Sequence, residues 1–235
     1  MGRILVLENQ IAMAIFFKVF KKKEAKRLWM VRFAIVGAGG HGRVIADIIL
    51  ACGGEIAFVV DDSPQGKILA NKNAISPKEF LMLGLQKEIK ITLAIGNCQA
   101  RRAFFEVFKQ HGFEIPSLIH SSAIISKSAK ISEACVVMPN VVVNAESTIE
   151  TGVILNTGCV VEHDCKVGEF SHLAPKSALC GGVRIGKDSH IGAGSVVIEG
   201  RSVGDGCMIG AGSVVINDIQ SFKKVVGNPA KKELQ

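Results

Sequence analysis

The sequence lacks the features that mark secreted and membrane proteins. Its seven cysteines form no CxxC pair, and no small-residue cleavage site follows the apolar run Ile11–Phe17. We therefore expect no secretory leader, and reduced thiols in a cytoplasmic protein. The apolar run ends at Lys18, far short of the ~20 residues that a membrane-spanning helix needs. The sequence thus predicts no integral membrane segment.

The body of the chain also has little excess charge. The formal net charge is +7, but residues 1–29 hold seven Lys or Arg against two Glu, which leaves only +2 for the rest. A nucleic-acid-binding domain carries its basic surface on the folded body, so we expect no nucleic-acid partner. A basic amphipathic stretch could lie on an anionic membrane surface. The simpler interpretation is that residues 1–29 are an extension that the chemistry does not need.

Residues 30–120 have the pattern of a small parallel α/β domain. Short apolar runs alternate with amphipathic stretches, which is the order of strands and crossover helices. The predicted strands and helices are, in chain order, strand 31–36, helix 43–52, strand 55–60, strand 92–95, helix 99–111 and strand 115–119.

A glycine-rich turn follows the first predicted strand. Gly37, Gly39 and Gly42 match G-x-G-x-x-G, and the acidic pair Asp61-Asp62 closes the next strand. Such a turn lets the backbone approach a phosphate or a sugar at a helix N-terminus. About 90 residues are too few for two mononucleotide-binding halves, and His41 places an imidazole inside the turn. We therefore predict a half-Rossmann unit that binds a nucleotide-sugar rather than NAD; the alternative for His41 is a water-facing residue at the start of a helix.

Residues 121–219 repeat with a period of six. From position 125, every sixth residue is aliphatic in all sixteen cases, and a small or modest side chain follows four residues later in nearly every repeat. This period fits neither an α-helix nor a simple sheet, but it does fit a triangular solenoid of short strands and corners. The sequence predicts a left-handed parallel β-helix of roughly five coils, in which the aliphatic residues fill the interior and the small residues let the chain turn. Residues 220–235 would cap it. The sixteen aliphatic positions are Ile125, Ile131, Val137, Val143, Ile149, Leu155, Val161, Val167, Leu173, Leu179, Ile185, Ile191, Val197, Val203, Ile209 and Val215.

The hexapeptide period, together with Val225–Lys231 (VVGNPAK) after the last repeat, resembles the hexapeptide-repeat acyltransferases. Segment 153–172 (VILNTGCVVEHDCKVGEFSH), with the glycine-rich turn, Asp61-Asp62 and Gly96-Asn97, is more specific. It resembles bacterial nucleotide-amino-sugar N-acetyltransferases of the bacillosamine-pathway type, and their relatives, the sialic acid O-acetyltransferase-like group. The resemblance implies an enzyme that uses acetyl-CoA as co-substrate and a nucleotide-linked amino sugar as acceptor. It also implies a homotrimer with active sites between neighbouring subunits.

The resemblance also implies roles for particular residues. His163 matches the general base, and Asp164 matches the acidic neighbour that raises its basicity, although the closest relatives carry the longer Glu there. The acetyl-CoA contacts would be made by His172, Gly181, Ala193 and Ala211. The nucleotide-sugar contacts would be made by Gly39, Gly40, His41, Asp61, Asp62 and Gly96, with Asn156 facing the sugar.

The remaining histidines and the cysteines have simpler interpretations. We expect His111 and His120 to be structural or solvated, and His190 to be a solvated corner residue. Cys135, Cys159, Cys165 and Cys207 occupy the small-residue position of the repeat, so we interpret them as packing residues. The spacing of His163, Asp164, Cys165 and His172 matches no zinc pattern, so we expect no metal.

Three functions compete. The leading one is N-acetylation of a nucleotide-linked amino sugar for a surface glycan, and the second is O-acetylation of a sialic-acid-like sugar with the same base and cofactor. The third is a catalytically inactive solenoid that serves as a scaffold, which the intact His163-Asp164 pair disfavours. Fold alone does not identify the acceptor.

Overall fold

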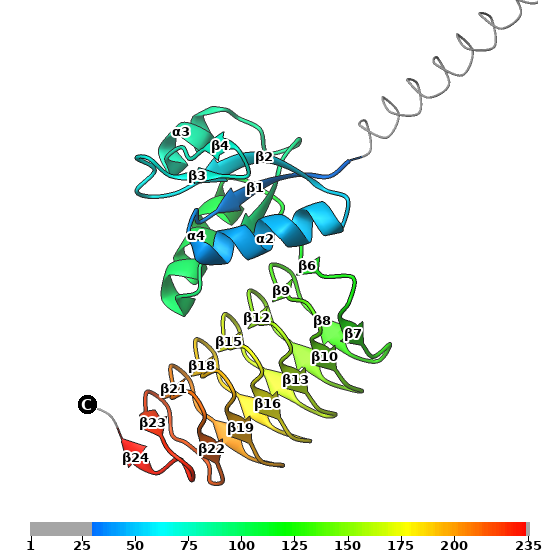
Figure 1. Cartoon of the computed structure of the whole chain (residues 1–235), viewed down its shortest axis with the longest axis vertical. Coiled ribbons are helices and arrows are strands. Elements are labelled where there is room, and N and C mark those ends of the chain that lie inside the picture. The colour runs from blue at the N-terminus through cyan, green and yellow to red at the C-terminus, as the bar shows by residue number, and fades with distance from the viewer. Residues whose placement is uncertain (1–29, 234–235) are drawn as a thin grey trace, which may run out of the picture. The chain divides into compact units, whose positions relative to one another are not determined.

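The computed structural model describes residues 30–233 (Figure 1). The extension predicted over residues 1–29 lies outside the described residues, so its dispensability stays a prediction. From Arg32 onward the chain forms one compact unit, in which a parallel α/β part is followed by a stack of β-helix coils. This is the predicted fold class.

The α/β part is built on a three-stranded parallel sheet with the order β2-β1-β5. The side chains of the central strand alternate between two apolar clusters: Phe33 and Ile35 belong with α2, whereas Ala34 and Val36 belong with α3 (Pro77–Met82) and α4. The central strand is therefore buried on both faces, as is typical of parallel sheets. The elements are β1 (Arg32–Val36), α2 (Gly40–Ala51), β2 (Glu55–Val60), β5 (Lys90–Leu93) and α4 (Cys98–Gln110).

A short insertion between β2 and β5 was not predicted. It consists of the antiparallel pair β3 (Ile68–Leu69) and β4 (Lys72–Asn73), followed by the helix α3 (Pro77–Met82). Helix α3 begins with a capping box, in which the Ser76 and Glu79 side chains each accept a hydrogen bond from the other residue's backbone N–H. The sequence signal for this helix was therefore local capping chemistry.

The strand predicted over residues 115–119 is wrong in both length and partner. Only β6 (Leu118–Ile119) is a strand, and it pairs with β9 (Val136–Val137) of the β-helix rather than with the α/β sheet. Pro116 has no N–H to donate to a strand ladder, and the chain crosses there from one part to the other.

Three parallel sheets form the sides of the β-helix, and strand pairing advances by 18 residues from coil to coil, as in the pairing of Ile154 with His172. We name the sides after their strand numbers. The six-stranded face contains β7 (Ile124–Ile125), β10 (Val142–Val143), β13 (Val160–Val161), β16 (Ala178–Leu179), β19 (Val196–Val197) and β22 (Val214–Val215). The five-stranded face contains β8 (Lys130–Ile131), β11 (Thr148–Ile149), β14 (Lys166–Val167), β17 (Arg184–Ile185) and β20 (Ser202–Val203). The eight-stranded face contains β6, β9, β12 (Ile154–Leu155), β15 (His172–Leu173), β18 (His190–Ile191), β21 (Met208–Ile209), β23 (Lys224–Val226) and the antiparallel β24 (Lys232–Glu233).

The repeat pattern is explained by the interior of the coils. Every predicted interior aliphatic from Val137 to Val215 is buried, whereas Ile125 and Ile131 in the first coil are half-buried. The small residues from Cys135 onward are also buried, and several of them join the coils: the Ser147 hydroxyl donates to Glu162 O and accepts from Cys165 N. The turn itself is made by the preceding residue, which has a positive φ at every sixth position from 134 to 212. The small residues therefore fill the corners rather than turn the chain.

Candidate active site

His163 and Asp164 lie at the corner between the six-stranded and five-stranded faces, here called the His163 corner. Asp164 occupies the left-handed turn position, with φ 61°, which Asp tolerates better than most residues. Its Oδ2 lies 2.8 Å from His163 Nδ1, and both side chains are about two-thirds exposed. The shorter carboxylate therefore does reach the imidazole. Because the carboxylate accepts a hydrogen bond from Nδ1–H, Nε2 is left as the unprotonated nitrogen.

Gly181 lies one coil further along the same corner, beside the His163 ring. A Cβ on Gly181 would lie 2.6 Å from His163 Cε1 and 2.7 Å from Nε2. These distances are far below van der Waals contact, so any side chain at position 181 would displace the imidazole. The backbone is fixed locally, because Gly182 N donates to His163 O at 2.9 Å. The structure thus brings His163, Asp164 and Gly181 together within one chain.

His172 is not beside His163, because it lies on the eight-stranded face, which is opposite the His163 corner. It lies outside the interior of the coils but is only 8% exposed, because the α/β part covers it. The His41 ring lies 6.4 Å from it and the His190 ring 4.8 Å, measured between centroids. His190, which we had expected to be solvated, is therefore a partly buried member of a histidine cluster that sequence reasoning missed.

The cluster is uncharged at neutral pH. Burial, with smaller contributions from His190, Arg101 and His41, lowers the pKa of His172 to about 3. Burial and the nearby Arg101 lower the pKa of His41 to about 4. The pKa of His190 is also lowered, by burial first and by Arg101 second. Neutral imidazoles can offer one donor and one acceptor each, and they attract neither phosphate nor carboxylate strongly.

Asn156 fixes the tautomer of His172. Its Oδ1 accepts from Thr157 N at 2.8 Å, so its amide nitrogen must face the imidazole, where Nδ2 lies 3.0 Å from His172 Nε2. Nε2 is thus the acceptor and the proton of His172 resides on Nδ1. Nδ1 of His172 and Nε2 of His41 are both buried without a hydrogen-bond partner among the described residues. Both atoms are enclosed by protein, so each is an unsatisfied polar group of the interior.

In the glycine-rich turn, two glycines allow close backbone packing and two others are open to solvent. A Cβ on Gly37 would lie 2.6 Å from Ala94 O, and one on Gly42 would lie 2.3 Å from Gly37 O. Gly39 and Gly40, in contrast, face open space. The first turn of α2 has no side-chain cap, so its N–H groups can receive an anionic or polar ligand.

Asp61 supports this turn from the end of β2. Its carboxylate accepts from Ala38 N at 2.8 Å, from Ser63 N at 2.9 Å and from Lys67 Nζ at 2.7 Å. Burial opposes ionisation, but the bonds from Lys67 and from the two backbone groups outweigh it and lower the pKa of Asp61 to about 2. The protein itself thus uses much of the hydrogen-bonding capacity of Asp61, whereas Asp62 is exposed.

Ala193 and Ala211 lie at the corner between the eight-stranded and six-stranded faces, here called the Ala193 corner. Both are exposed, and Gly212 N donates to Ala193 O at 2.9 Å. Asn156 lies at this corner two coils earlier. Apart from His172 on the eight-stranded face, one chain therefore places the predicted site residues of the β-helix at two corners. The His163 corner and the Ala193 corner are the two edges of the six-stranded face.

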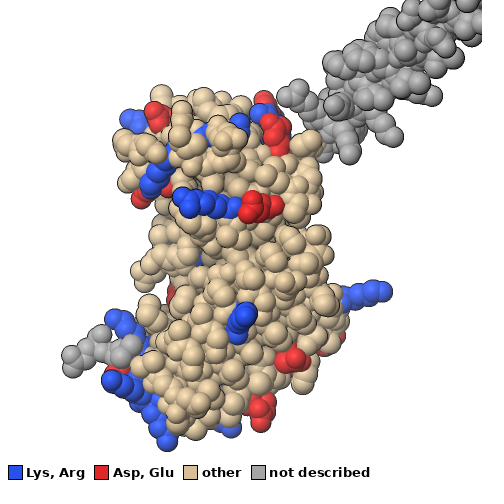
Figure 2. All heavy atoms as spheres, in the orientation of Figure 1, with Lys and Arg blue, Asp and Glu red and all other residues tan. Residues whose placement is uncertain are grey.

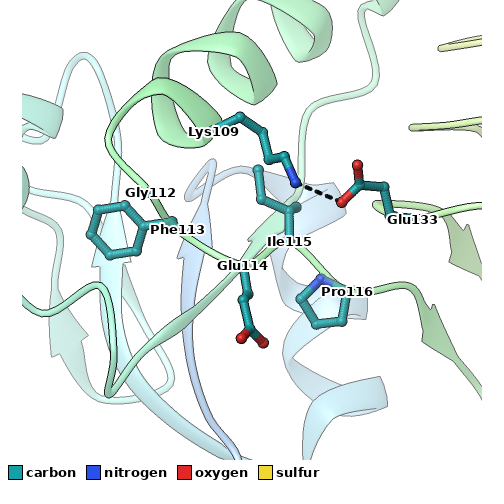
Figure 3. Close-up of a pocket in the computed structure, with 7 residues that line it drawn as sticks. All are labelled: Lys109, Gly112, Phe113, Glu114, Ile115, Pro116 and Glu133. Atoms are coloured by element: carbon teal, nitrogen blue, oxygen red, sulfur yellow. Dashed lines mark hydrogen bonds and ion pairs between the residues drawn. The ribbon is translucent and has the colours of Figure 1, made fainter.

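Two hollows lie near these elements. One, after α4, is lined by Lys109, by 112–116 and by Glu133, and Lys109 Nζ spans it to Glu133 Oε2 at 2.8 Å (Figure 3). It contains none of the predicted site residues. The other lies between the start of α4 and the β-helix, and it is lined by Gly96, Asn97 and His190 among others.

Over 30–233, no group of three or more His, Cys, Asp or Glu side chains is arranged to hold a metal ion. No helix in this part of the chain has the length and apolar character required to cross a membrane.

Both parts of the chain match known families. Residues 32–108 match the PglD N-terminal domain, and residues 164–199 and 182–217 match the bacterial transferase hexapeptide (six repeats). A mutant GDP-perosamine N-acetyl transferase from Caulobacter crescentus, solved in complex with CoA and GDP-perosamine, is 36% identical with a TM-score of 0.82; the match covers 85% of this chain and 95% of that one.

Two other solved structures are also similar. The acetyltransferase domain of PglB from Neisseria gonorrhoeae, in complex with acetyl coenzyme A, is 38% identical with a TM-score of 0.81, and the match covers 86% of this chain and 98% of that one. WeeI from Acinetobacter baumannii is 23% identical with a TM-score of 0.77, over 87% and 100% of the two chains, and shows the fold alone. The likeness spans the α/β part and the β-helix together, and the chain belongs to the PglD-type family of hexapeptide-repeat nucleotide-amino-sugar N-acetyltransferases.

Proposed function

We propose that the protein transfers the acetyl group of acetyl-CoA to the amino group of a nucleotide-linked amino sugar that is used to build a surface glycan. One observation carries this proposal: His163 presents an unprotonated Nε2 beside a glycine backbone, while its Nδ1–H donates a hydrogen bond to Asp164. The similar structures were solved with GDP-perosamine, CoA or acetyl coenzyme A bound, which supports the two substrates. The expected cytoplasmic location stays a prediction.

The chemistry requires one proton to move twice. As the amine nitrogen attacks the thioester carbonyl, His163 Nε2 accepts the proton that the nitrogen loses, and the C–N bond forms. Asp164 stabilises the resulting imidazolium, and a backbone N–H at Gly181 can donate to the tetrahedral oxyanion. The intermediate collapses, the C–S bond breaks, and the imidazolium returns the proton to the sulfur. The products are the N-acetyl sugar and free CoA.

The protein acts as a homotrimer in this proposal, and the six-stranded face is the surface that supports it. Its outward side chains are all aliphatic, whereas the five-stranded face presents polar and charged ones. The surface over β10, β13, β16 and β19 is largely uncharged in Figure 2. An aliphatic face of this extent favours association with another copy. The outward residues are Ile124, Val142, Val160, Ala178, Val196 and Val214 on the first face, and Lys130, Thr148, Lys166, Arg184 and Ser202 on the second.

A cyclic trimer built on this face would complete the site. In a cyclic assembly the contact is heterologous, so one edge of a subunit meets the opposite edge of the next. The two edges of the six-stranded face are the His163 corner and the Ala193 corner. The base and Gly181 of one subunit would then face Ala193, Ala211 and Asn156 of its neighbour. Acetyl-CoA would bind along that seam.

The acceptor would bind at the junction between the α/β part and the β-helix. Gly39, Gly40 and Asp62 are open at the turn, and His41 directly follows Gly40. His172, which the resemblance assigned to acetyl-CoA, lies beside His41, so this proposal assigns it to the acceptor instead. Neutral imidazoles suit the hydroxyls of a sugar, and the open backbone suits its nucleotide. The observed family favours an amine over the hydroxyl of a sialic-acid-like sugar as acceptor, and the intact base disfavours an inactive scaffold.

The decisive experiment measures CoA release with matched acceptors and variants. A nucleotide-linked amino sugar should be turned over far faster than the same sugar without its nucleotide. His163→Ala should lower kcat by ~10²–10⁴-fold while the KM for acetyl-CoA changes little. His111→Ala, at the end of α4, is the control and should behave like the wild type. Near-native turnover by His163→Ala would exclude the assigned base. Equal turnover of a free sialic acid would favour O-acetylation, and a monomer by light scattering would exclude a site between subunits.

A further inference from the structure

Arg101 is a buried cation to which the proposed chemistry assigns no role. It lies in the first turn of α4 and is 0% exposed. Its guanidinium donates five hydrogen bonds to backbone carbonyls and also lies beside the Cys98 thiol, and no carboxylate among the described residues forms a salt bridge with it. The acceptors are Ile95 O at 2.8 Å, Gly96 O at 3.1 Å, Gly152 O at 2.8 Å, Ser171 O at 3.3 Å and Phe170 O.

These carbonyls belong to three separate stretches of backbone. Ile95 and Gly96 form the loop between β5 and α4, whereas Gly152 and Phe170 lie on two successive coils at the corner between the five-stranded and eight-stranded faces. Ser171 directly precedes His172. A guanidinium holds its five N–H donors in one rigid plane, so a single side chain fixes the positions of these stretches relative to one another.

The neighbouring Arg102 connects α4 to the same corner through ordinary ion pairs. Arg102 is partly exposed and pairs with Asp188 in bidentate fashion, at 3.1 and 2.9 Å, and with Glu169 at 3.2 Å. Arg101 instead keeps an unpaired charge in the interior, which is a costly way to gain stability. A contribution to stability therefore does not explain this buried arginine, and we look for its role in the backbone segments that it holds together.

We propose that Arg101 is a positioning residue for the acceptor: it holds the Gly96 loop against the β-helix beside His172, so that both can contact one acceptor molecule. The identity of that ligand rests on the proposed function, whereas the hydrogen bonds of Arg101 are independent of it. Arg101 also has an electrostatic effect, because its charge lies near His41, His172 and His190 and contributes to the lowered pKa of each.

Kinetics of three variants test the positioning role. Arg101→Met should lower kcat/KM for the acceptor at least ~10-fold, because a displacement of about 1 Å can cost ~10²-fold, while the KM for acetyl-CoA stays within about twofold. Arg101→Lys keeps the charge but not the planar donors, and should be impaired to a similar degree. Arg102→Met is the matched control, with a loss below about threefold. Equal losses in Arg101→Met and Arg102→Met, or none in either Arg101 variant, would overturn the proposal.

A second measurement does not depend on turnover. The charged or titratable groups that face His172 are His41 on α2, Arg101 on α4 and His190 on β18. In histidine NMR titrations, assigned with His172→Gln, the midpoint of His172 should rise in Arg101→Met but not in Arg101→Lys. If Arg101→Met does not fold, the kinetics of Arg101→Lys carry the test. A wild type that turns over no nucleotide-sugar would refute the proposed function alone, whereas unchanged midpoints in Arg101→Met would refute the placement of Arg101 beside the cluster.

Discussion

Gly181→Ala tests the candidate active site with a single methyl group. The new Cβ would lie 2.6 Å from His163 Cε1, and the ring would have to retreat by roughly 0.8 Å to reach the 3.4 Å of ordinary contact. The backbone on both sides is held by coil-to-coil hydrogen bonds, so the exposed imidazole must move instead. A base displaced by that much is expected to lose ~10²-fold in kcat.

A double-mutant cycle separates this steric effect from a general defect. Gly181 is not in the left-handed region, so alanine is tolerated by the backbone. In a His163→Ala background, Gly181→Ala should change kcat by less than about twofold. In that background it should also stabilise the fold by ~0.4–1 kcal/mol, because alanine reduces the entropy of the unfolded chain. Steady-state kinetics and thermal melts of the four proteins provide the measurement. Near-native kcat in Gly181→Ala, or an equal loss in both backgrounds, would refute the assigned geometry.

Three further predictions follow from the same structure. Asp164→Asn should lower kcat less than His163→Ala does and should alter the pH–rate profile, since the Nδ1 proton loses its carboxylate; a profile identical to the wild type would contradict this. Removal of residues 1–29 should leave the oligomer and its turnover intact, as light scattering and CoA release can check; an inactive or insoluble protein would contradict it. The pKa values of His41 and His172, about 4 and 3 in the folded state, lie below the ordinary 6.5, so the unfolded chain binds more protons and stability must fall as pH drops below about 6.5. Each should cost roughly 2 kcal/mol between pH 7 and pH 5, and chemical denaturation at the two pH values should show a smaller difference in His172→Gln than in the wild type.

Local chemistry made parts of the site predictable. His163 and Asp164 are adjacent in the sequence, so their contact depends on one turn and one short side chain. Gly37 and Gly42 could be found because their spacing reflects close backbone packing. No comparable signal marked Arg101, which stands beside an equally plausible Arg102 on the same helix. Its burial depends on carbonyls that lie up to 70 residues away in the sequence.

The sequence by itself determined the β-helix, because a period of six repeats one local choice in every coil: an aliphatic residue inward and a small residue at the corner. It also determined the parallel α/β part, whose strands and helices follow from apolar runs and glycines. Only the tertiary structure decided where side chains from different coils and helices meet. It placed His172 among buried histidines, away from His163, since a step of nine residues crosses from a corner to the opposite face. It also left the six-stranded face aliphatic and uncovered by the described chain. Such outcomes depend on long-range packing, which no local pattern of residues encodes.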